Sequence, residues 1–178
     1  MDAPLRAVPE SAAAEGAGMA EEQRTFEEFF RGEYTRLFRA LCLVTGSRHE
    51  AEEVMQDSFL KVWERWERVA LMEDPKGFLY RVAMNEFRSR YRSTARALKR
   101  RATLTRSDDA FATVEDRDVV IRALRTLIPQ QRAAVVLTSL LDYSSEEAGL
   151  MLGMKAATVR ALTTRARASM RQTMEDPR

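Results

Sequence analysis

Apolar residues recur at three- and four-residue spacing along most of this 178-residue chain, and no segment sustains the alternating pattern of a β-strand. This spacing places apolar side chains on one face of a helix. Only 7 glycines and 5 prolines are available to interrupt the pattern. The sequence therefore predicts an all-α fold. The first apolar stripe consists of Phe26, Phe29, Phe30, Tyr34, Leu37, Phe38 and Leu41.

Short breaks divide the first half of the chain into helices. Gly46 and Ser47 end the first helix, and a second is expected over residues 48–66. The Asp74-Pro75 pair precedes a third helix over residues 77–96, because proline is favoured at or near a helix start. These helices are expected to form a three-to-four-helix domain over residues 26–96.

Two segments lack this apolar periodicity. Residues 1–25 are rich in Ala, Glu, Gly and Pro, and they are expected to form a disordered leader. Residues 97–113 change from basic to acidic, and they are expected to form a flexible linker. A second domain of four helices is expected over residues 114–178, with one of its helices over residues 131–141.

The last two helices of the second domain have clear boundary signals. Ser144 precedes Glu147 by three residues, which is the pattern of a capping box at a helix start. Gly153 stands where a left-handed residue can end the helix over residues 145–152, and a basic helix follows over residues 156–170. This arrangement predicts a helix-turn-helix, whose second helix enters the major groove of DNA. Such helix pairs also occur in plain bundles, but the arginines favour DNA binding.

Positive charge is concentrated in residues 75–106. The whole chain has a net charge of +2, yet this segment has ten Lys and Arg residues and one acid, Glu86, a net charge of +9. The concentration indicates either a polyanion-binding helix or a solvated basic linker. Arginines mixed with aromatic residues suit single-stranded nucleic acid. Phe87 is interpreted as core, and the pattern leaves Tyr80 and Tyr91 undecided.

Signals for catalysis, metal binding and membrane insertion are weak. His49 and Cys42, the only histidine and the only cysteine, cannot supply a zinc site. The sequence has neither a glycine-rich phosphate loop nor a plausible catalytic triad. Its apolar runs are shorter than the roughly 20 residues of a membrane span. We therefore expect a cytoplasmic protein without cofactor, metal or enzymatic activity.

Three stretches follow one another along the chain: AEEVMQDSFLKVWERW (residues 51–66), DPKGFLYRVAMNEFRSRYR (residues 74–92) and the helix-turn-helix segment over residues 127–170. Together they resemble the extracytoplasmic-function (ECF) sigma factors of the sigma-70 superfamily. The first stretch resembles the helix that binds core RNA polymerase, and the second resembles the segment that unpairs and reads the minus-ten promoter element. The third resembles the domain that reads the minus-thirty-five element. The resemblance implies that residues 26–96 are sigma domain two and residues 114–178 are sigma domain four.

The resemblance also implies roles for individual residues. One group would dock on the clamp helices of the polymerase β′ subunit: Asp57, Phe59, Leu60, Lys61 and Trp63. A second would contact minus-ten DNA: Tyr80, Asn85, Arg88, Arg90 and Arg92. A third would lie in the major groove of the minus-thirty-five element: Lys155, Thr158, Arg160, Thr164 and Arg165. Other implied partners are the polymerase β flap and an anti-sigma factor, and no obligate homo-oligomer is expected.

The chain departs from the family pattern in the helix-turn-helix. The family usually has Lys/Arg-Ser-Arg where this sequence has Arg160-Ala161-Leu162. Lys155 stands where a helix-capping serine is common in the family. Ala148-Gly149 stands where the family usually has a bulkier aliphatic residue followed by alanine. A glycine inside a helix is expected to weaken it by about 1 kcal/mol.

Three alternatives to an active sigma factor remain open. A stand-alone helix-turn-helix regulator would explain the C-terminal helices but would leave the Asp57–Trp63 stretch and the basic helix over residues 77–96 without a role. A nucleotidyl or RNA-modifying enzyme lacks a candidate catalytic group. An inactive decoy that titrates regulators has the same sequence features.

Overall fold

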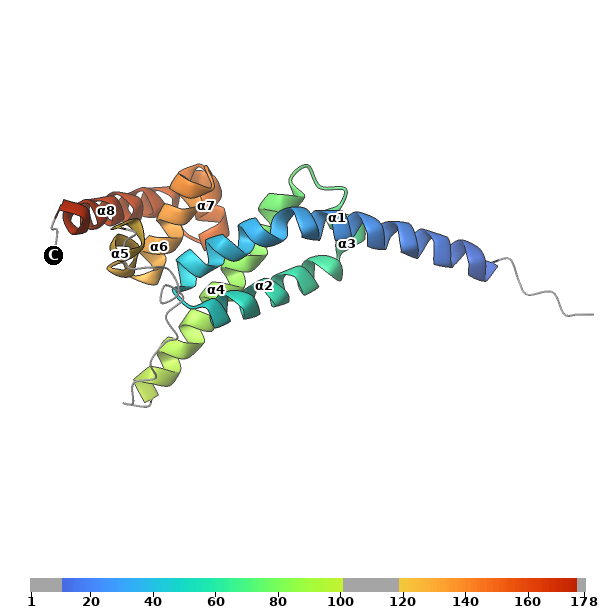
Figure 1. Ribbon diagram of the computed structural model, residues 1–178, viewed down its shortest axis with the longest axis horizontal. Coiled ribbons are helices and arrows are strands. Elements are labelled where there is room, and N and C mark those ends of the chain that lie inside the picture. Colours follow the sequence, from blue (N-terminus) through green and yellow to red (C-terminus); the bar gives the residue numbers. More distant parts are fainter. Residues whose placement is uncertain (1–10, 101–118, 176–178) are drawn as a thin grey trace, which may run out of the picture.

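The computed structural model describes residues 11–100 and 119–175, and every regular element in these residues is a helix. The helices form two groups (Figure 1). The first consists of α1 (Ser11–Thr45), α2 (Arg48–Trp63), α3 (Trp66–Val69) and α4 (Pro75–Arg100). The second consists of α5 (Val119–Arg125), α6 (Pro129–Val135), the π-helix η1 (Val136–Leu140), α7 (Ser145–Leu152) and α8 (Ala156–Glu175). The prediction of an all-α, two-domain fold is confirmed.

Helix α1 begins at Ser11, well before the start expected at Phe26. The additional segment is rich in Ala and Glu, which have high helix propensity even where no apolar stripe is present. The part of the expected leader from Ser11 onward is therefore helical. Residues 1–10 lie outside the described residues.

Side-chain caps set the boundaries of the next two long helices. Ser47 accepts a hydrogen bond from the amide of Glu50 at 3.2 Å and begins α2. Asp74 accepts one from the amide of Gly77 at 2.8 Å, so α4 begins at Pro75, slightly earlier than expected. Both caps satisfy amides of the first helical turn, which have no partner within the helix.

The core of the first group lies where α2 runs beside α1 and α4 crosses them (Figure 1). Phe87 is 3% exposed, which confirms its interpretation as a core residue. Burial of each Val or Leu side chain contributes about 1.5–3 kcal/mol to folding. The fully buried aliphatic residues of this core include Leu37, Leu41, Val44, Val54, Val62 and Leu79.

The helix expected over residues 131–141 is two elements. Helix α6 begins at Pro129, and from Val136 the chain widens into the π-helix η1. The π-helix closes with a hydrogen bond from the Leu141 amide to the Val136 carbonyl at 3.1 Å, and Asp142 follows with a φ of 58°. This ending brings Tyr143 beside α4, whereas a regular helix would continue along its own axis.

The helix-turn-helix pair has the boundaries that its caps predict. In the capping box of α7, the Glu147 amide donates to Ser144 Oγ at 3.1 Å and the Ser144 amide donates to Glu147 Oε2 at 2.7 Å. Gly153 has a φ of 59° and a ψ of 42°, so it ends α7 in the left-handed conformation that glycine adopts without strain. Helix α8 begins at Ala156, as expected, and continues to Glu175.

Replacing Ser144 by alanine should lower the free energy of unfolding by about 1 kcal/mol, because the N-cap oxygen is lost. Thermal or urea unfolding followed by circular dichroism would measure the change. Ser145→Ala is the matched control, because Ser145 lies one position inside the helix, where alanine is favoured. An equal effect of the two substitutions would contradict the capping assignment.

The two groups of helices pack against each other, α7 on α4 and α6 on α1 (Figure 1). Buried residues from both groups join in one apolar cluster. Arg132 of α6 adds a polar contact, because its Nη2 donates to the carbonyl oxygen of Thr45, the last residue of α1, at 3.1 Å. Of the expected linker, residues 97–100 continue α4 and residues 101–113 lie outside the described residues.

Candidate protein-binding and DNA-binding surfaces

The outer face of α2 carries exposed apolar side chains. Leu60 is 56% exposed and Trp63 is 38% exposed, whereas Phe59 is 5% exposed and packs on Phe30 with ring centroids 4.6 Å apart. Trp63 contacts Phe26 of α1 edge-on, at 4.8 Å between centroids. Exposed apolar side chains that adjoin one another mark interaction surfaces. They border a shallow groove between α1 and α2, lined by Phe26, Phe30, Tyr34, Met55, Gln56, Phe59, Leu60 and Trp63.

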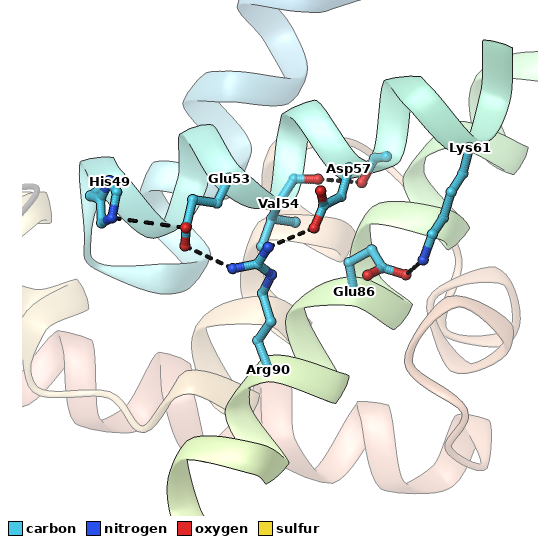
Figure 2. A network of polar contacts seen from close by, with 8 residues as sticks. His49, Glu53, Val54, Asp57, Lys61, Glu86 and Arg90 are labelled. Atoms are coloured by element: carbon cyan, nitrogen blue, oxygen red, sulfur yellow. Dashed lines mark hydrogen bonds and ion pairs between the residues drawn. The ribbon is translucent and has the colours of Figure 1, made fainter. Parts of the chain in front are cut away.

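Ion pairs connect this helix to α4 (Figure 2). Arg90 extends from α4 between two carboxylates of α2, and its Nη1 and Nη2 lie 2.7 Å from Glu53 and 2.5 Å from Asp57. Lys61 of α2 pairs in turn with Glu86 of α4. The hydrogen bond with Asp57 is the main cause that raises the pKa of Arg90, so the guanidinium stays charged.

The Arg90 network joins two groups of residues that the family resemblance assigns to different partners. Arg90 belongs to the expected minus-ten group and Asp57 to the expected polymerase group. The side chains are about one third to two fifths exposed, so each pair contributes at most about 1 kcal/mol and is easily exchanged for another partner. Residues so far apart in the chain give no periodic signal, so this connection cannot be predicted from the sequence.

The expected minus-ten residues on α4 divide into exposed and covered sets. Asn85 and Arg92 lie on the exposed side, and Arg92 Nε donates to the Arg88 carbonyl at 3.3 Å. Tyr80 is completely buried, and its ring lies 5.9 Å from that of Tyr143. Arg88 is only partly exposed. In this conformation Tyr80 is therefore closed to any ligand.

Tyr91 is an accessible aromatic residue on α4 that the sequence left undecided. It is 38% exposed and stacks on Phe87, with ring centroids 6.1 Å apart and planes inclined by 27°. A ring held in this way offers its free face to an unstacked base, whereas Tyr80 does not. Its position four residues after the core residue Phe87, among arginines, is the sequence signal that points to it.

The five expected residues of the minus-thirty-five group lie exposed on α8 and on the turn before it: Lys155, Thr158, Arg160, Thr164 and Arg165. Val159, Thr163 and Ala166 form the opposite, buried face of the same helix. Arg160 pairs with Glu146 of α7 at 2.9 Å, and Thr164 Oγ1 donates to the Arg160 carbonyl at 2.9 Å. The helix-turn-helix therefore presents one continuous polar and basic face.

Other kinds of site receive no support from the described parts of the chain. Within residues 11–100 and 119–175 no helix is both long and apolar enough to cross a bilayer. The same residues contain no cluster of His, Cys, Asp and Glu that could hold a metal ion.

Two family models match the chain. The model for sigma-70 region 2 matches residues 29–97, and a model for sigma-70 region 4 matches residues 117–170. The first range covers α2, all the residues that line the groove except Phe26, and nearly all of α4, and the second covers the helix-turn-helix.

Similar proteins and structures agree with the family models. The RNA polymerase sigma-E factor of Streptomyces coelicolor is 32% identical over 151 residues, which are 83% of this chain and 84% of that protein. The ECF RNA polymerase sigma factor SigM of Mycobacterium tuberculosis is 29% identical over 159 residues, 86% of this chain and 79% of that protein.

Among solved structures, the sigma factor RpoE of Bartonella quintana, crystallised with the anti-sigma factor NepR, shares the fold. Its TM-score is 0.71 at 21% identity, and the match covers 87% of this chain and 99% of that chain. The order of the two matched regions, the identity to sigma-E over most of both chains and the shared fold lead to one conclusion. This chain is a member of the ECF sigma factors of the sigma-70 superfamily.

Proposed function

We propose that this protein binds core RNA polymerase, directs it to specific promoters and assists promoter opening. The observation that carries the proposal is the presence of two kinds of surface on one chain. An exposed apolar face on α2 suits a protein partner, and polar, basic faces on α4 and α8 suit DNA. A sigma factor needs both.

The face of α2 is the proposed docking surface for the β′ clamp helices. Leu60 and Trp63 provide the exposed apolar contact, and Asp57 and Lys61 provide charges of both signs beside it. Phe59 supports this surface from the core and presents little area of its own. Large buried aromatic and aliphatic anchors supply most of the affinity of such interfaces.

Helix α4 is the proposed minus-ten reader. Asn85, Arg88, Arg90 and Arg92 would bind the phosphates and edges of unpaired bases, and aromatic rings would stack on them. Tyr91 joins Tyr80 as a candidate for stacking because its ring is accessible. Domain two is assigned to residues 26–96.

Helix α8 is the proposed minus-thirty-five reader, within a domain four assigned to residues 114–178. The residues of its first turns would meet base edges in the major groove, and the later arginines would meet phosphates. The same domain would contact the polymerase β flap. Because both DNA-binding domains belong to one chain, binding of one promoter element by the first domain raises the effective concentration of the second domain at the other element.

In this role the protein would act in the cytoplasm without catalytic activity or a cofactor. It would not require assembly into a homo-oligomer. An anti-sigma factor is a proposed regulator. A protein of the same fold, the sigma factor RpoE of Bartonella quintana, was solved as a complex with the anti-sigma factor NepR, which supports this part of the proposal.

Run-off transcription on genomic fragments tests the proposed function. Core polymerase together with this protein should give discrete transcripts that core polymerase alone does not give. Arg165→Ala should reduce the transcripts and lower the slope of DNA affinity against salt by about 1, because one phosphate contact is lost. Arg68→Ala, a change of an exposed arginine on α3, is the matched control and should have no effect.

A stand-alone helix-turn-helix regulator is the second candidate, because the DNA-binding face of α8 is open in the structure while part of α4 is covered. Such a protein would bind a palindromic duplex as a dimer without polymerase. Tight duplex binding by the isolated protein, with no transcripts in the run-off assay, would favour this candidate.

A further inference from the structure

We propose that Glu146 is a specificity-determining residue of the helix-turn-helix, because it directs Arg160 to a G·C base pair instead of a phosphate. This role deepens the proposed function and rests on it, since it assumes that α8 lies in the major groove. Glu146 belongs to α7 and lies outside the five residues that the family resemblance assigns to minus-thirty-five DNA.

An ion pair joins the two helices of the helix-turn-helix on their exposed side. Arg160 Nη1 on α8 donates a hydrogen bond to Glu146 Oε1 on α7 at 2.9 Å. The two side chains are 58% and 67% exposed, so the pair adds little to the stability of the fold and stays accessible to a ligand. Its place on the proposed DNA-binding face therefore indicates a role in binding.

The backbone positions of the two residues are fixed relative to each other. Helix α7 approaches the following turn so closely at Gly149 that a Cβ there would lie 2.8 Å from the carbonyl oxygen of Met154. Val159, the neighbour of Arg160 on α8, is completely buried. Glu146 lies in the first turn of α7, where the positive end of the helix dipole favours an ionised carboxylate. Arg160 is thus held beside an anion before DNA binds, which reduces the entropy lost on binding.

The carboxylate of Glu146 makes Arg160 a poor contact for phosphate. A phosphate that approached Arg160 would also approach Glu146, and the two negative charges would repel each other. Among the described residues no carboxylate pairs with Lys155 or Arg165, so these two cations of the same face are available for phosphates. Arg160 therefore differs from the other cations of the face in what it can bind.

The pair matches the hydrogen-bonding pattern of G·C in the major groove. Guanine presents two acceptors, N7 and O6, and cytosine presents the N4 amino donor beside them. The N–H groups of Arg160 that Glu146 does not use can donate to guanine. An ionised carboxylate accepts several hydrogen bonds, so Glu146 can also accept from cytosine. In an A·T pair the N6 amino group of adenine would face the guanidinium, so donor would meet donor.

Glu146 increases the difference in affinity between base pairs. Its charge lowers the affinity of the α8 face for any DNA, because DNA is a polyanion. At a G·C pair the hydrogen bonds of Arg160 and Glu146 to the two bases offset this loss, and at the other pairs they do not. Specificity is such a difference of affinities, and it can be raised by weakening the wrong complexes.

Selection from a pool of random duplexes tests this role. The full-length protein is incubated at low salt with short duplexes whose base pairs are randomised between constant ends, and the bound fraction is sequenced. The wild type is expected to select a sequence with a G·C pair at a fixed position. Affinities for that sequence, and for duplexes in which this pair is changed, are then measured by fluorescence anisotropy.

Glu146→Ala should reduce the preference for G·C at that position by about tenfold, and it should bind the changed duplexes at least as tightly as the wild type. Arg160→Lys keeps the charge but loses the planar fork, so it should lose the preference at the same position. Glu147→Ala is the matched control, because it removes the same charge from a carboxylate that the capping box uses. This control should lower the Tm and leave the base preference unchanged.

An unchanged preference for G·C in Glu146→Ala would overturn the proposal. An equal loss of affinity for all duplexes would do so too, since that result indicates a merely structural role. A selected sequence in which no G·C pair depends on both Glu146 and Arg160 would also contradict it.

Run-off transcription by the wild type separates this proposal from the proposed function. Discrete transcripts together with an unchanged base preference in Glu146→Ala would refute the role of Glu146 alone. A G·C position that depends on both residues, without transcripts, would refute the proposed function alone.

Discussion

Replacing Trp63 by alanine should weaken binding to core RNA polymerase by roughly 30-fold, the equivalent of about 2 kcal/mol for an aromatic interface anchor. Trp63 is 38% exposed on α2, and its ring is held edge-on by Phe26. A ring that is already fixed in the free protein loses little conformational entropy when a partner covers it. Surface plasmon resonance on immobilised core polymerase would measure the change.

Two controls separate loss of docking from loss of folding. Trp63→Phe keeps an aromatic ring against Phe26 and should recover most of the affinity, whereas thermal unfolding should be similar for all three proteins. Leu60→Ala and Leu71→Ala form a matched pair, because both leucines are exposed, at 56% and 88%, and only Leu60 lies on α2. Equal effects of these two substitutions on polymerase binding would refute the assigned surface.

Gly149→Ala should destabilise domain four by about 1–3 kcal/mol, although alanine has the higher helix propensity. A Cβ at Gly149 would lie 2.8 Å from the carbonyl oxygen of Met154 and 3.4 Å from the amide nitrogen of Ala156. Both are backbone atoms, one of the turn and one of the first residue of α8, and they cannot move independently of α8. The substitution should therefore also displace α8 and reduce binding to duplex DNA.

Gly32→Ala is the matched control for this prediction. Gly32 lies inside α1, and nothing is within 4 Å of the Cβ that alanine would add. This substitution should stabilise the protein by up to about 1 kcal/mol, through helix propensity alone. Thermal unfolding of the two variants should therefore move in opposite directions. A Gly149→Ala protein at least as stable as the wild type would rule out the close approach of α7 to the turn.

The role of Gly149 depends on residues outside its own helix. From the sequence, this glycine is a weakness within α7, because only its own helix enters the estimate. In the structure it is the position at which α7 approaches the backbone of the following turn. Propensity is a property of one helix, whereas close approach depends on two elements.

Local signals predicted the elements that depend on local interactions. The bounds of α7 and the start of α8 follow from Ser144, Glu147 and Gly153, whose hydrogen bonds and left-handed geometry lie within a few residues. The early start of α1 and the π-helix within residues 131–141 were missed. The first has no apolar stripe, and the second keeps a helical apolar pattern while its hydrogen bonds change register.

The sequence by itself determined that this protein is all-α, where its helix-turn-helix lies and which faces carry positive charge, because periodicity, caps and charge are encoded in neighbouring residues. Only the tertiary structure decided which of those residues are accessible. Arg90 is held by two carboxylates of α2, and Tyr80 is completely buried, with its ring 5.9 Å from that of Tyr143. The partners in these contacts are distant along the chain, and their meeting depends on how the helices pack.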